Sequence, residues 1–357
     1  MVQSHMEPAA YRFVLDGTPV DMKSFGHGHI NGTFVVTTDT HKKYILQKIN
    51  THVFSDPKAL MRNIGAITEY LQERVTDARQ ILHFRPTADG VYYYEDENGE
   101  FWRCYEFAEG ICLEAPESEQ DFYESAIAFG RFQQMLADFP ADTLVETIPE
   151  FHNTINRYRL LHEAIASDAC GRAAEVKCDL DFLLSREQEA GTLQRMRESG
   201  ELPLRVTHND TKLNNVLLDP VTRKALCVLD LDTVMPGLSL YDFGDAIRFG
   251  AATASEDEKD LSKMSLNLRL FQIFTEGFLT ACPSLTENEI AMLPMGAKII
   301  TLELAARFMT DYLEGDHYFK TAYPEHNLVR ARSQMKLVKD MEEKWEQMQN
   351  IVKNLKK

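Results

Sequence analysis

The chain has 357 residues, of which 44% are hydrophobic, and it carries a formal net charge of −17. This length and composition predict a globular protein with two lobes, each large enough for its own hydrophobic core. The acidic balance argues against nucleic acid or an anionic membrane as a partner, because both need a basic protein face.

The cysteines and the apolar runs bear on the compartment. The six cysteines show no Cys-x-x-Cys spacing, and several lie in apolar runs where reduced thiols pack as small hydrophobic groups. No apolar run approaches the roughly 18 residues that a membrane span requires, and the N-terminal residues show no signal-peptide hydrophobic region. We therefore expect a cytoplasmic protein that does not contact a membrane.

The first hundred residues predict a small β-rich lobe. Short β-rich runs at 33–38, 43–49, 90–95 and 100–107 alternate with turns. One helix interrupts these runs. We expect it to begin near Asp56-Pro57, because a capping aspartate followed by proline is typical of a first helical turn. The apolar residues of this helix keep helical spacing: Leu60, Ile64, Ile67 and Leu71.

A glycine-rich segment, Gly26-His27-Gly28-His29-Ile30-Asn31-Gly32, precedes the first of these runs. Glycines let backbone amides approach a phosphate without a Cβ in the way, so Gly26, Gly28 and Gly32 are candidate phosphate contacts in a nucleotide-covering hairpin. His29 and Asn31 add side-chain donors that face either the nucleotide or an acceptor. An ordinary glycine-rich turn is the alternative.

The strand predicted at 43–49 holds two candidate phosphate contacts that cannot act together. Successive side chains of a strand point to opposite faces, so Gln47 and Lys48 diverge. We assign the phosphate contact to Lys48, and the alternative is a solvated strand lysine.

The chain changes character near Glu109-Gly110, where a strand ends and a helical pattern follows from Ser118 onward. Free backbone groups at such a strand exit can pair with adenine, which makes Glu106 and Ala108 candidate base contacts; an ordinary strand-to-loop exit is the alternative. These features predict a nucleotide-binding lobe over residues 1–108 and a catalytic and substrate-binding lobe over 109–357.

The run from His208 to Asn215 reads His-x-Asp-x-Lys-x-x-Asn, which is the spacing of a kinase catalytic loop. In this reading Asp210 accepts the proton of an acceptor hydroxyl, Lys212 faces the transferring phosphoryl group, and Asn215 binds magnesium. His208 braces the loop. Two apolar runs, 216–218 and 225–229, follow around a polar turn and predict a buried hairpin that anchors it.

A second metal ligand is predicted at the end of that hairpin. Asp230 lies twenty residues after Asp210 (230 − 210), and oxygen ligands suit magnesium. Asp242 belongs to an Asp-Phe-Gly run that resembles the metal motif of protein kinases, but it lies too far along the chain, so we expect it to cap a helix or to brace the catalytic loop. Asp232 is a weaker metal candidate.

The C-terminal apolar residues form one stripe among lysines and glutamates, which predicts an amphipathic helix packed on the larger lobe rather than a dimer contact. The stripe consists of Leu337, Met341, Trp345, Met348, Val352 and Leu355. We expect a monomer.

Together these motifs resemble the aminoglycoside phosphotransferase and choline kinase superfamily, whose fold is α+β and bilobal like that of protein kinases, with a β-rich N-terminal lobe and a mostly helical C-terminal lobe. More narrowly, they are similar to the N-acetylhexosamine 1-kinase family. The runs that carry this similarity are 26–31, 44–50, 60–63, 204–215, 231–237, 311–316 and 323–330.

The resemblance implies phosphorylation of the anomeric hydroxyl of N-acetylglucosamine or N-acetylgalactosamine, with ATP and Mg²⁺ as cofactors. It places the catalytic aspartate at Asp210 and the magnesium ligands at Asn215 and Asp230. The implied sugar pocket draws on His29, Asn31, Arg307, Asp311 and Tyr318. The sequence departs from the superfamily at Gln47, where a lysine is usual.

Three alternatives stay open. In the first, a kinase of the same fold phosphorylates choline or an aminoglycoside, and carboxylates or an aromatic cage surround the ammonium group of that acceptor. In the second, the chain is a degenerate kinase that binds nucleotide without turnover. In the third, Arg307 forms a buried salt bridge with Asp311, one helical turn away, and does not contact a sugar.

Overall fold

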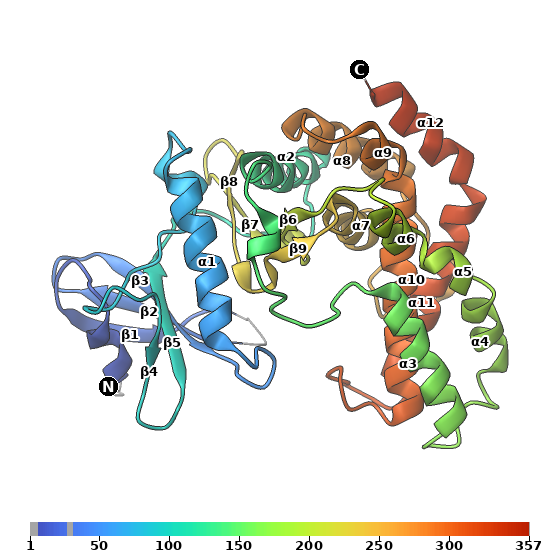
Figure 1. Cartoon of the computed structure of the whole chain (residues 1–357), viewed down its shortest axis with the longest axis horizontal. Coiled ribbons are helices and arrows are strands. Elements are labelled where there is room, and N and C mark those ends of the chain that lie inside the picture. The colour runs from blue at the N-terminus through green and yellow to red at the C-terminus, as the bar shows by residue number, and fades with distance from the viewer. Residues whose placement is uncertain (1–5, 27–30, 357) are drawn as a thin grey trace.

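Alternating apolar residues build the sheet of the N-terminal lobe in the computed structural model, which describes residues 6–26 and 31–356 (Figure 1). The five strands are antiparallel and lie in the order β1-β2-β3-β5-β4. Their bounds are β1 Pro19–Ser24, β2 Gly32–Thr38, β3 Lys43–Ile49, β4 Tyr94–Glu95 and β5 Phe101–Glu106. Two of the predicted site residues, Gly28 and His29, lie outside the described residues.

The sheet has two apolar faces. One face, which includes Leu46 and Trp102, packs against Ala9 and Ala10 of a short N-terminal 3-10 helix (Pro8–Arg12). The other face contributes Ile49 and Phe101 to the larger core, which continues through α1 (Pro57–Gln72) into the C-terminal lobe.

The predicted start of α1 is confirmed. The Asp56 carboxylate accepts a hydrogen bond from the backbone amide of Ala59 at 2.8 Å, and Pro57 occupies the first turn. Asn63 of α1 donates to the carbonyls of Val145 at 2.8 Å and Val234 at 3.3 Å. The helix therefore stands between the sheet and the C-terminal lobe, and Asn63 ties it to the C-terminal lobe (Figure 1).

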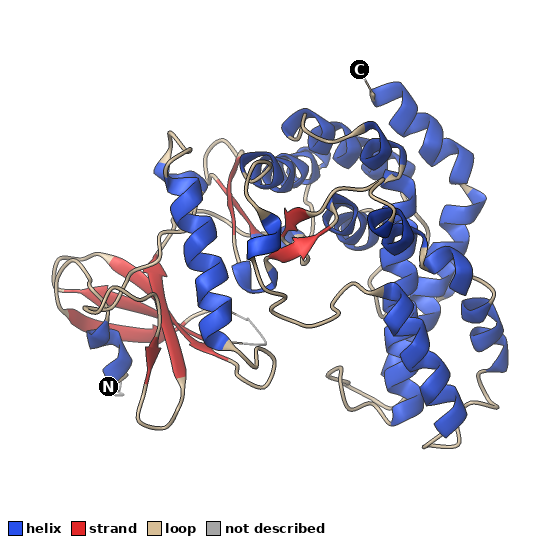
Figure 2. Cartoon of the chain, viewed as in Figure 1, coloured by secondary structure: helices blue, strands red, loops and turns tan. Residues whose placement is uncertain are grey.

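The C-terminal lobe is mostly helical (Figure 2), with the strands of this lobe confined to its junction with the small lobe. Its α-helices are α2 Glu119–Met135, α3 Thr154–Ser167, α4 Lys177–Leu184, α5 Glu187–Ala190, α6 Thr192–Glu198, α7 Ser239–Gly250, α8 Leu268–Ala281, α9 Glu287–Ala291, α10 Leu293–Glu314, α11 His326–Glu343 and α12 Trp345–Leu355. The α+β bilobal prediction is thus confirmed.

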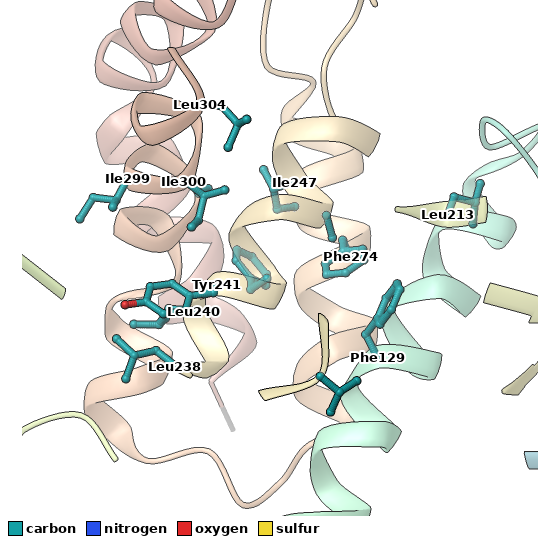
Figure 3. Close-up of a cluster of buried hydrophobic side chains, with 14 of the residues drawn as sticks. Phe129, Leu213, Leu238, Leu240, Tyr241, Ile247, Phe274, Ile299, Ile300 and Leu304 are labelled. Carbon is teal, nitrogen blue, oxygen red and sulfur yellow. The ribbon is translucent and has the colours of Figure 1, made fainter. Parts of the chain in front are cut away.

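A hydrophobic cluster lies at the centre of this lobe (Figure 3). Phe129 of α2, Ile247 of α7, Phe274 of α8 and Ile300 of α10 all belong to it. Leu213 of the predicted catalytic loop is a member of the same core. Each of these side chains is buried. The loop that carries the predicted catalytic residues is therefore anchored on the main core of the protein.

Two short antiparallel ladders complete the C-terminal lobe. β7 (Val216–Leu218) pairs with β8 (Ala225–Val228), as the two apolar runs predicted, and both strands are fully buried. β6 (Arg205–Thr207) pairs with β9 (Met235–Gly237). The chain between β6 and β9 contains the catalytic loop, the hairpin and Asp230.

Three predicted elements differ from the observed ones. The strand predicted over 90–95 shrinks to β4, because Thr87 and Val91 close a turn through a backbone hydrogen bond of 2.8 Å. β1 was missed. The C-terminal stripe forms two helices, α11 and α12, because the chain changes direction at Lys344. The ammonium group of Lys344 donates a hydrogen bond to the Leu266 carbonyl at 2.8 Å.

The proposed lobe boundary, 108/109, falls between the end of β5 and the start of α2. Here Ile111 exchanges two backbone hydrogen bonds of 2.9 Å with Leu218 of β7. A Cβ on Gly110 would lie 2.5 Å from the Leu217 side chain, so this position needs glycine. No helix among the described residues is long and apolar enough to cross a membrane.

Candidate active site

The catalytic loop is held by backbone hydrogen bonds to the start of α7. Asp242 accepts from the amides of His208 at 3.0 Å and Asn209 at 2.7 Å, and from the Gln133 side chain at 2.7 Å. Asn209 has a φ of +65°. The predicted bracing role of Asp242 is confirmed, and it explains how a non-glycine residue is kept in the left-handed region.

His208 and Thr211 attach the loop to the core of the C-terminal lobe. The His208 ring contacts Phe129 and Phe132 edge to face, and its Nε2 lies 2.7 Å from the Leu229 carbonyl. The Thr211 amide donates to Asp245 at 3.0 Å. His208 and Thr211 therefore tie the loop to the core, as predicted for His208.

Asp210, Lys212 and Asn215 meet at the surface of this loop. One Asp210 oxygen lies 2.8 Å from Lys212 Nζ, and the other accepts from Asn215 Nδ2 at 3.0 Å. Burial lowers the pKa of Lys212, but the charges of Asp210 and Asp245 outweigh burial, so its pKa is raised overall. Lys212 is thus a fixed positive charge beside a partly exposed carboxylate.

Asp230 lies next to Asn215 across the hairpin. The amide of Leu229 donates to the Asn215 carbonyl at 2.8 Å, and Asp230 follows with a φ of +56°. Asp230 is exposed at the surface, but desolvation by the surrounding protein raises its pKa to about 6, and the charges of Asp232 and Asp210 act in the same direction. Three carboxylates therefore converge here, which is an arrangement that a bound cation would stabilise.

The donor set fits magnesium. Asn215 and Asp230 supply amide and carboxylate oxygens, and this ion is commonly held by one or two carboxylates together with nucleotide phosphates and water. Among residues 6–26 and 31–356, no group of three or more His, Cys, Asp or Glu side chains forms a complete metal centre. The protein would hold the ion only together with the phosphates.

A polar network joins the small lobe to this site. Arg103 of β5 forms a buried ion pair with Asp232 and donates to Gln47 Oε1 at 2.9 Å. Asn31 Nδ2 donates to the other Asp232 oxygen at 2.6 Å. Asp232 is therefore engaged in an ion pair between the lobes, which disfavours the weaker hypothesis that it is a metal ligand.

The surroundings of Lys48 do not favour its assignment to the phosphates. Lys48 pairs with Glu100 at 2.5 Å and lies opposite Trp102, on the sheet face that packs away from the C-terminal lobe. Gln47 lies opposite Arg103 on the other face and joins the network with Asp232. Both faces of β3 are apolar, so the sequence did not show which face met the site.

The other nucleotide candidates lie near the lobe junction. Gly26 has a φ of +74°, which favours glycine, and Gly32 begins β2. Glu106 ends β5, and its Oε1 lies 3.2 Å from Nη1 of Arg85. Ala108 packs on the main core, between β5 and the backbone contact of Ile111 with Leu218.

Arg307, Asp311 and Tyr318 line one pocket of about 110 Å³, although they come from α10 and the loop after it. The Arg307 Nη2 and Tyr318 hydroxyl are 3.4 Å apart, and the guanidinium also faces the rings of Phe151 and Phe319. The alternative salt bridge to Asp311 is wrong: the carboxylate nearest to Arg307 is Glu303, at 3.9 Å.

Asp311 has a different setting from the one predicted. Its carboxylate accepts from the backbone amides of residues 317–319 at 2.8–2.9 Å and from Asn327 at 2.7 Å. It is 3% exposed. Asp311 therefore shapes the loop that presents Tyr318, and its oxygens are already occupied.

Sequence reasoning missed Arg103 and Arg157. Arg157 of α3 lines the Arg307 pocket, and its buried Nε has no hydrogen-bond partner among the described residues. Burial and the charge of Arg307 lower its pKa. No local motif marks either arginine, because each acquires its setting from a segment distant in the chain.

Residues 21–262 match the phosphotransferase enzyme family, APH. Among solved structures, an aminoglycoside phosphotransferase from Alicyclobacillus acidocaldarius is similar in fold, with a TM-score of 0.67, 13% identity, and coverage of 99% of this chain and 98% of that one. A spectinomycin phosphotransferase solved with ADP and spectinomycin gives 0.57 and 11%, covering 90% and 95%. A Plasmodium vivax ethanolamine kinase gives 0.54 and 14%, covering 88% and 82%. Because the family match spans more than half of the chain, this protein belongs to the APH phosphotransferase family.

Proposed function

We propose that this protein is an ATP- and magnesium-dependent kinase that phosphorylates the anomeric hydroxyl of N-acetylhexosamines. The observation that carries phosphoryl transfer is the convergence of Asp210, Lys212 and Asn215 on one braced loop, with Asp230 across the hairpin. Phosphoryl transfer depends chiefly on positioning and charge neutralisation, and this group supplies both.

Each residue has a distinct role in the proposal. Asp210 orients the acceptor hydroxyl and accepts its proton, and Lys212 offsets charge on the transferring phosphoryl group. Asn215 and Asp230 would hold magnesium, which when bound neutralises phosphate oxygens. The anomeric hydroxyl is the most acidic hydroxyl of a reducing sugar, so a carboxylate is an adequate base for it.

The Arg307 pocket supports a neutral sugar as acceptor. Arg157 and Arg307 line it beside Glu314 and Asp311, and the oxygens of Asp311 are already occupied by the protein, so an ammonium group would meet two guanidinium groups there. The unpartnered Nε of Arg157 calls for an oxygen acceptor, which an acetamide or a hydroxyl provides. Tyr318, which is 67% exposed, would close over a bound ring. Asn31 and His29 are proposed to contact the same sugar from the small lobe.

The nucleotide would lie between the lobes. Gly26, Gly28 and Gly32 are proposed to cover its phosphates, and the backbone of Glu106 and Ala108 to pair with adenine. This arrangement rests on the family's fold and on the positions of Gly26, Gly32, Glu106 and Ala108 near the lobe junction.

A second candidate acceptor is a cationic amino alcohol or aminoglycoside. A larger cavity, of about 360 Å³, lies beside Asn209 of the catalytic loop, and its lining includes three carboxylates and two aromatic rings: Glu146, Glu150, Glu198, Phe151 and Tyr241. Such a lining suits an ammonium group. The cavity competes with the Arg307 pocket as the acceptor site.

The deciding experiment measures ADP release with ATP and magnesium across N-acetylglucosamine, N-acetylgalactosamine, glucose, galactose, choline and kanamycin. Loss of the reducing end is followed for each active sugar. Turnover of the N-acetylhexosamines with loss of reducing character supports the proposal. Turnover of choline or kanamycin alone overturns the acceptor, and no turnover at all supports a non-catalytic protein.

Substituting one residue in each pocket separates the two acceptor sites. Arg307→Met should raise the KM for an N-acetylhexosamine about 10- to 100-fold, since a charge-assisted hydrogen bond is lost. Glu150→Gln, in the acidic cavity, should leave that KM unchanged. The reverse pattern would assign the acceptor to the acidic cavity.

A further inference from the structure

The small lobe lacks the cation that kinases usually carry on the third strand. Kinases present a lysine from β3 to the nucleotide phosphates. Here the residue of β3 that faces the site is Gln47, and Lys48 lies on the far face with Glu100. Three carboxylates and the incoming phosphates would otherwise meet at this site with no positive charge from the small lobe.

The neighbouring strand supplies a cation at the same place. Arg103 of β5 is the direct cross-strand partner of Gln47, and directly paired residues of an antiparallel ladder share one face. Its Nε donates to Gln47 Oε1 at 2.9 Å, so the guanidinium lies over the end of the glutamine side chain. A lysine at position 47 would reach the same region.

The guanidinium is fixed and faces the metal site. Arg103 is 2% exposed, and its ion pair with Asp232 orients it from the C-terminal lobe. Asp232 is two residues from Asp230, and the charges of both carboxylates act on Arg103. A second small-lobe contact, Asn31 to Asp232 at 2.6 Å, holds the same carboxylate.

We propose that Arg103 is the small-lobe cation for the nucleotide phosphates, presented from β5 in place of a lysine on β3. Gln47 and Asp232 act as its positioning residues, in the way that an acidic partner orients the lysine of other kinases. A guanidinium retains its charge in a buried setting and has donors left after pairing with one carboxylate, so it can hold Asp232 and a phosphate together.

This inference rests on the proposed nucleotide-dependent function, and it is tested without an acceptor. Calorimetry measures the Kd of the full chain for magnesium ADP and for adenosine. The ratio of the two values reports the phosphate contribution alone. A wild-type protein that binds neither ligand would contradict the proposed function itself, whereas the variants below address only Arg103.

The main variant is Arg103→Met with Asp232→Asn, which removes both charges so that no unpaired charge stays buried. We expect ADP binding to weaken about 10- to 100-fold and adenosine binding to change less than about twofold. Asp232→Asn alone should lose less of the ADP preference than the double variant, because Arg103 keeps its charge and its contact with Gln47. Adding Gln47→Lys to the double variant should restore part of it, because the lysine returns a cation from β3.

Three results would overturn the proposal: an unchanged ADP preference in the double variant, an equal loss in Asp232→Asn alone, or no recovery on adding Gln47→Lys. Lys48→Met is the matched control and should leave the ADP Kd unchanged; a loss as large as that of the double variant would assign the phosphates to Lys48. If thermal melting shows that the double variant is unfolded, Arg103→Gln replaces it, and retention of ADP preference there also contradicts the proposal.

Discussion

Asp210, the proposed base, is positioned by its neighbours on the loop. It is partly exposed, and it is held from two sides by Lys212 at 2.8 Å and Asn215 at 3.0 Å. These contacts orient its oxygens without covering them. The position of the side chain is therefore determined before any substrate arrives, which is the condition for efficient proton transfer.

Replacing Asp210 with Asn should reduce kcat about 10²- to 10⁴-fold, because the amide cannot accept the proton of the acceptor hydroxyl. The Kd for magnesium ADP should change little. Initial rates and calorimetry measure the two quantities. Asp89→Asn, at an exposed loop position, is the control and should match the wild type in both. Full activity of Asp210→Asn would remove Asp210 from the mechanism.

At this scale the sequence predicted what lies within one motif and missed what lies across the fold. The spacing of His208 to Asn215 was enough to place Asp210, Lys212 and Asn215 together. Arg103 could not be found in this way, since its partner Asp232 is 129 residues away. The sequence could not show whether Lys48 or Gln47 faces the C-terminal lobe, because Ile45 and Ile49 make one face of β3 apolar and Tyr44 and Leu46 make the other face apolar.

At the scale of elements, α7 serves as the support of the catalytic loop. In its first turn, Asp242 accepts hydrogen bonds from two loop amides. One turn later, Asp245 accepts a hydrogen bond from the Thr211 amide at 3.0 Å. The loop therefore depends on where α7 packs. Helix α10 sets that packing, because Gly244 of α7 and Gly296 of α10 approach closely.

Asp242→Ala should lower both stability and kcat. It leaves the buried amides of His208 and Asn209 without their acceptor, at a cost of about 1–3 kcal/mol in the free energy of unfolding. Urea unfolding and initial rates measure the two effects. Asp121→Ala removes another buried carboxylate, one that pairs with Arg223, and should lower stability without lowering the kcat of the folded fraction. Unchanged kcat in Asp242→Ala would show that the loop does not need this brace.

Gly244→Ala should destabilise the contact between α7 and α10. An added Cβ would lie 2.5 Å from the Gly296 carbonyl oxygen, and backbone cannot move aside as a side chain can. We expect a loss of about 1–3 kcal/mol in the free energy of unfolding. Gly65→Ala in α1 is the matched control: its Cβ meets the Tyr92 ring at 3.1 Å, and better helix propensity offsets that contact. Equal unfolding midpoints for the two variants would contradict this account of the α7–α10 contact.

For the whole molecule, the order of β-rich and helical segments was enough to predict the α+β bilobal fold. Periodicity indicates which segments are strands and which are helices, and the change near Glu109-Gly110 separates the two kinds. The pockets were beyond prediction, because they form where distant elements meet. Arg157 of α3 and Arg307 of α10 line the same pocket only after those helices pack together.

The packing of α3 against α10 also buries a charged group. Glu303 of α10 is fully buried. Its carboxylate accepts hydrogen bonds from His152 Nδ1 at 3.0 Å and from the Thr154 hydroxyl at 2.9 Å. Burial raises the pKa of this carboxyl, but His152, Arg307 and Arg157 outweigh burial and hold the pKa below its ordinary value of 4.5. The unfolded chain therefore binds the Glu303 proton at a higher pH than the folded protein does.

This difference has a defined sign. A carboxyl whose pKa is depressed on folding adds stability above its unfolded pKa, and that stability is lost as the pH falls through the folded value. Urea unfolding of the wild type should therefore show a lower free energy of unfolding at about pH 4 than at about pH 6.

Glu303→Gln should be less stable than the wild type at the higher pH. Its free energy of unfolding should fall less on acidification, because it lacks one carboxyl group whose pKa is lowered by folding. Glu163→Gln, on the exposed side of α3, should keep the wild-type pH dependence. A Glu303→Gln variant with the wild-type slope would show that the Glu303 network does not couple the packing of α3 and α10 to pH.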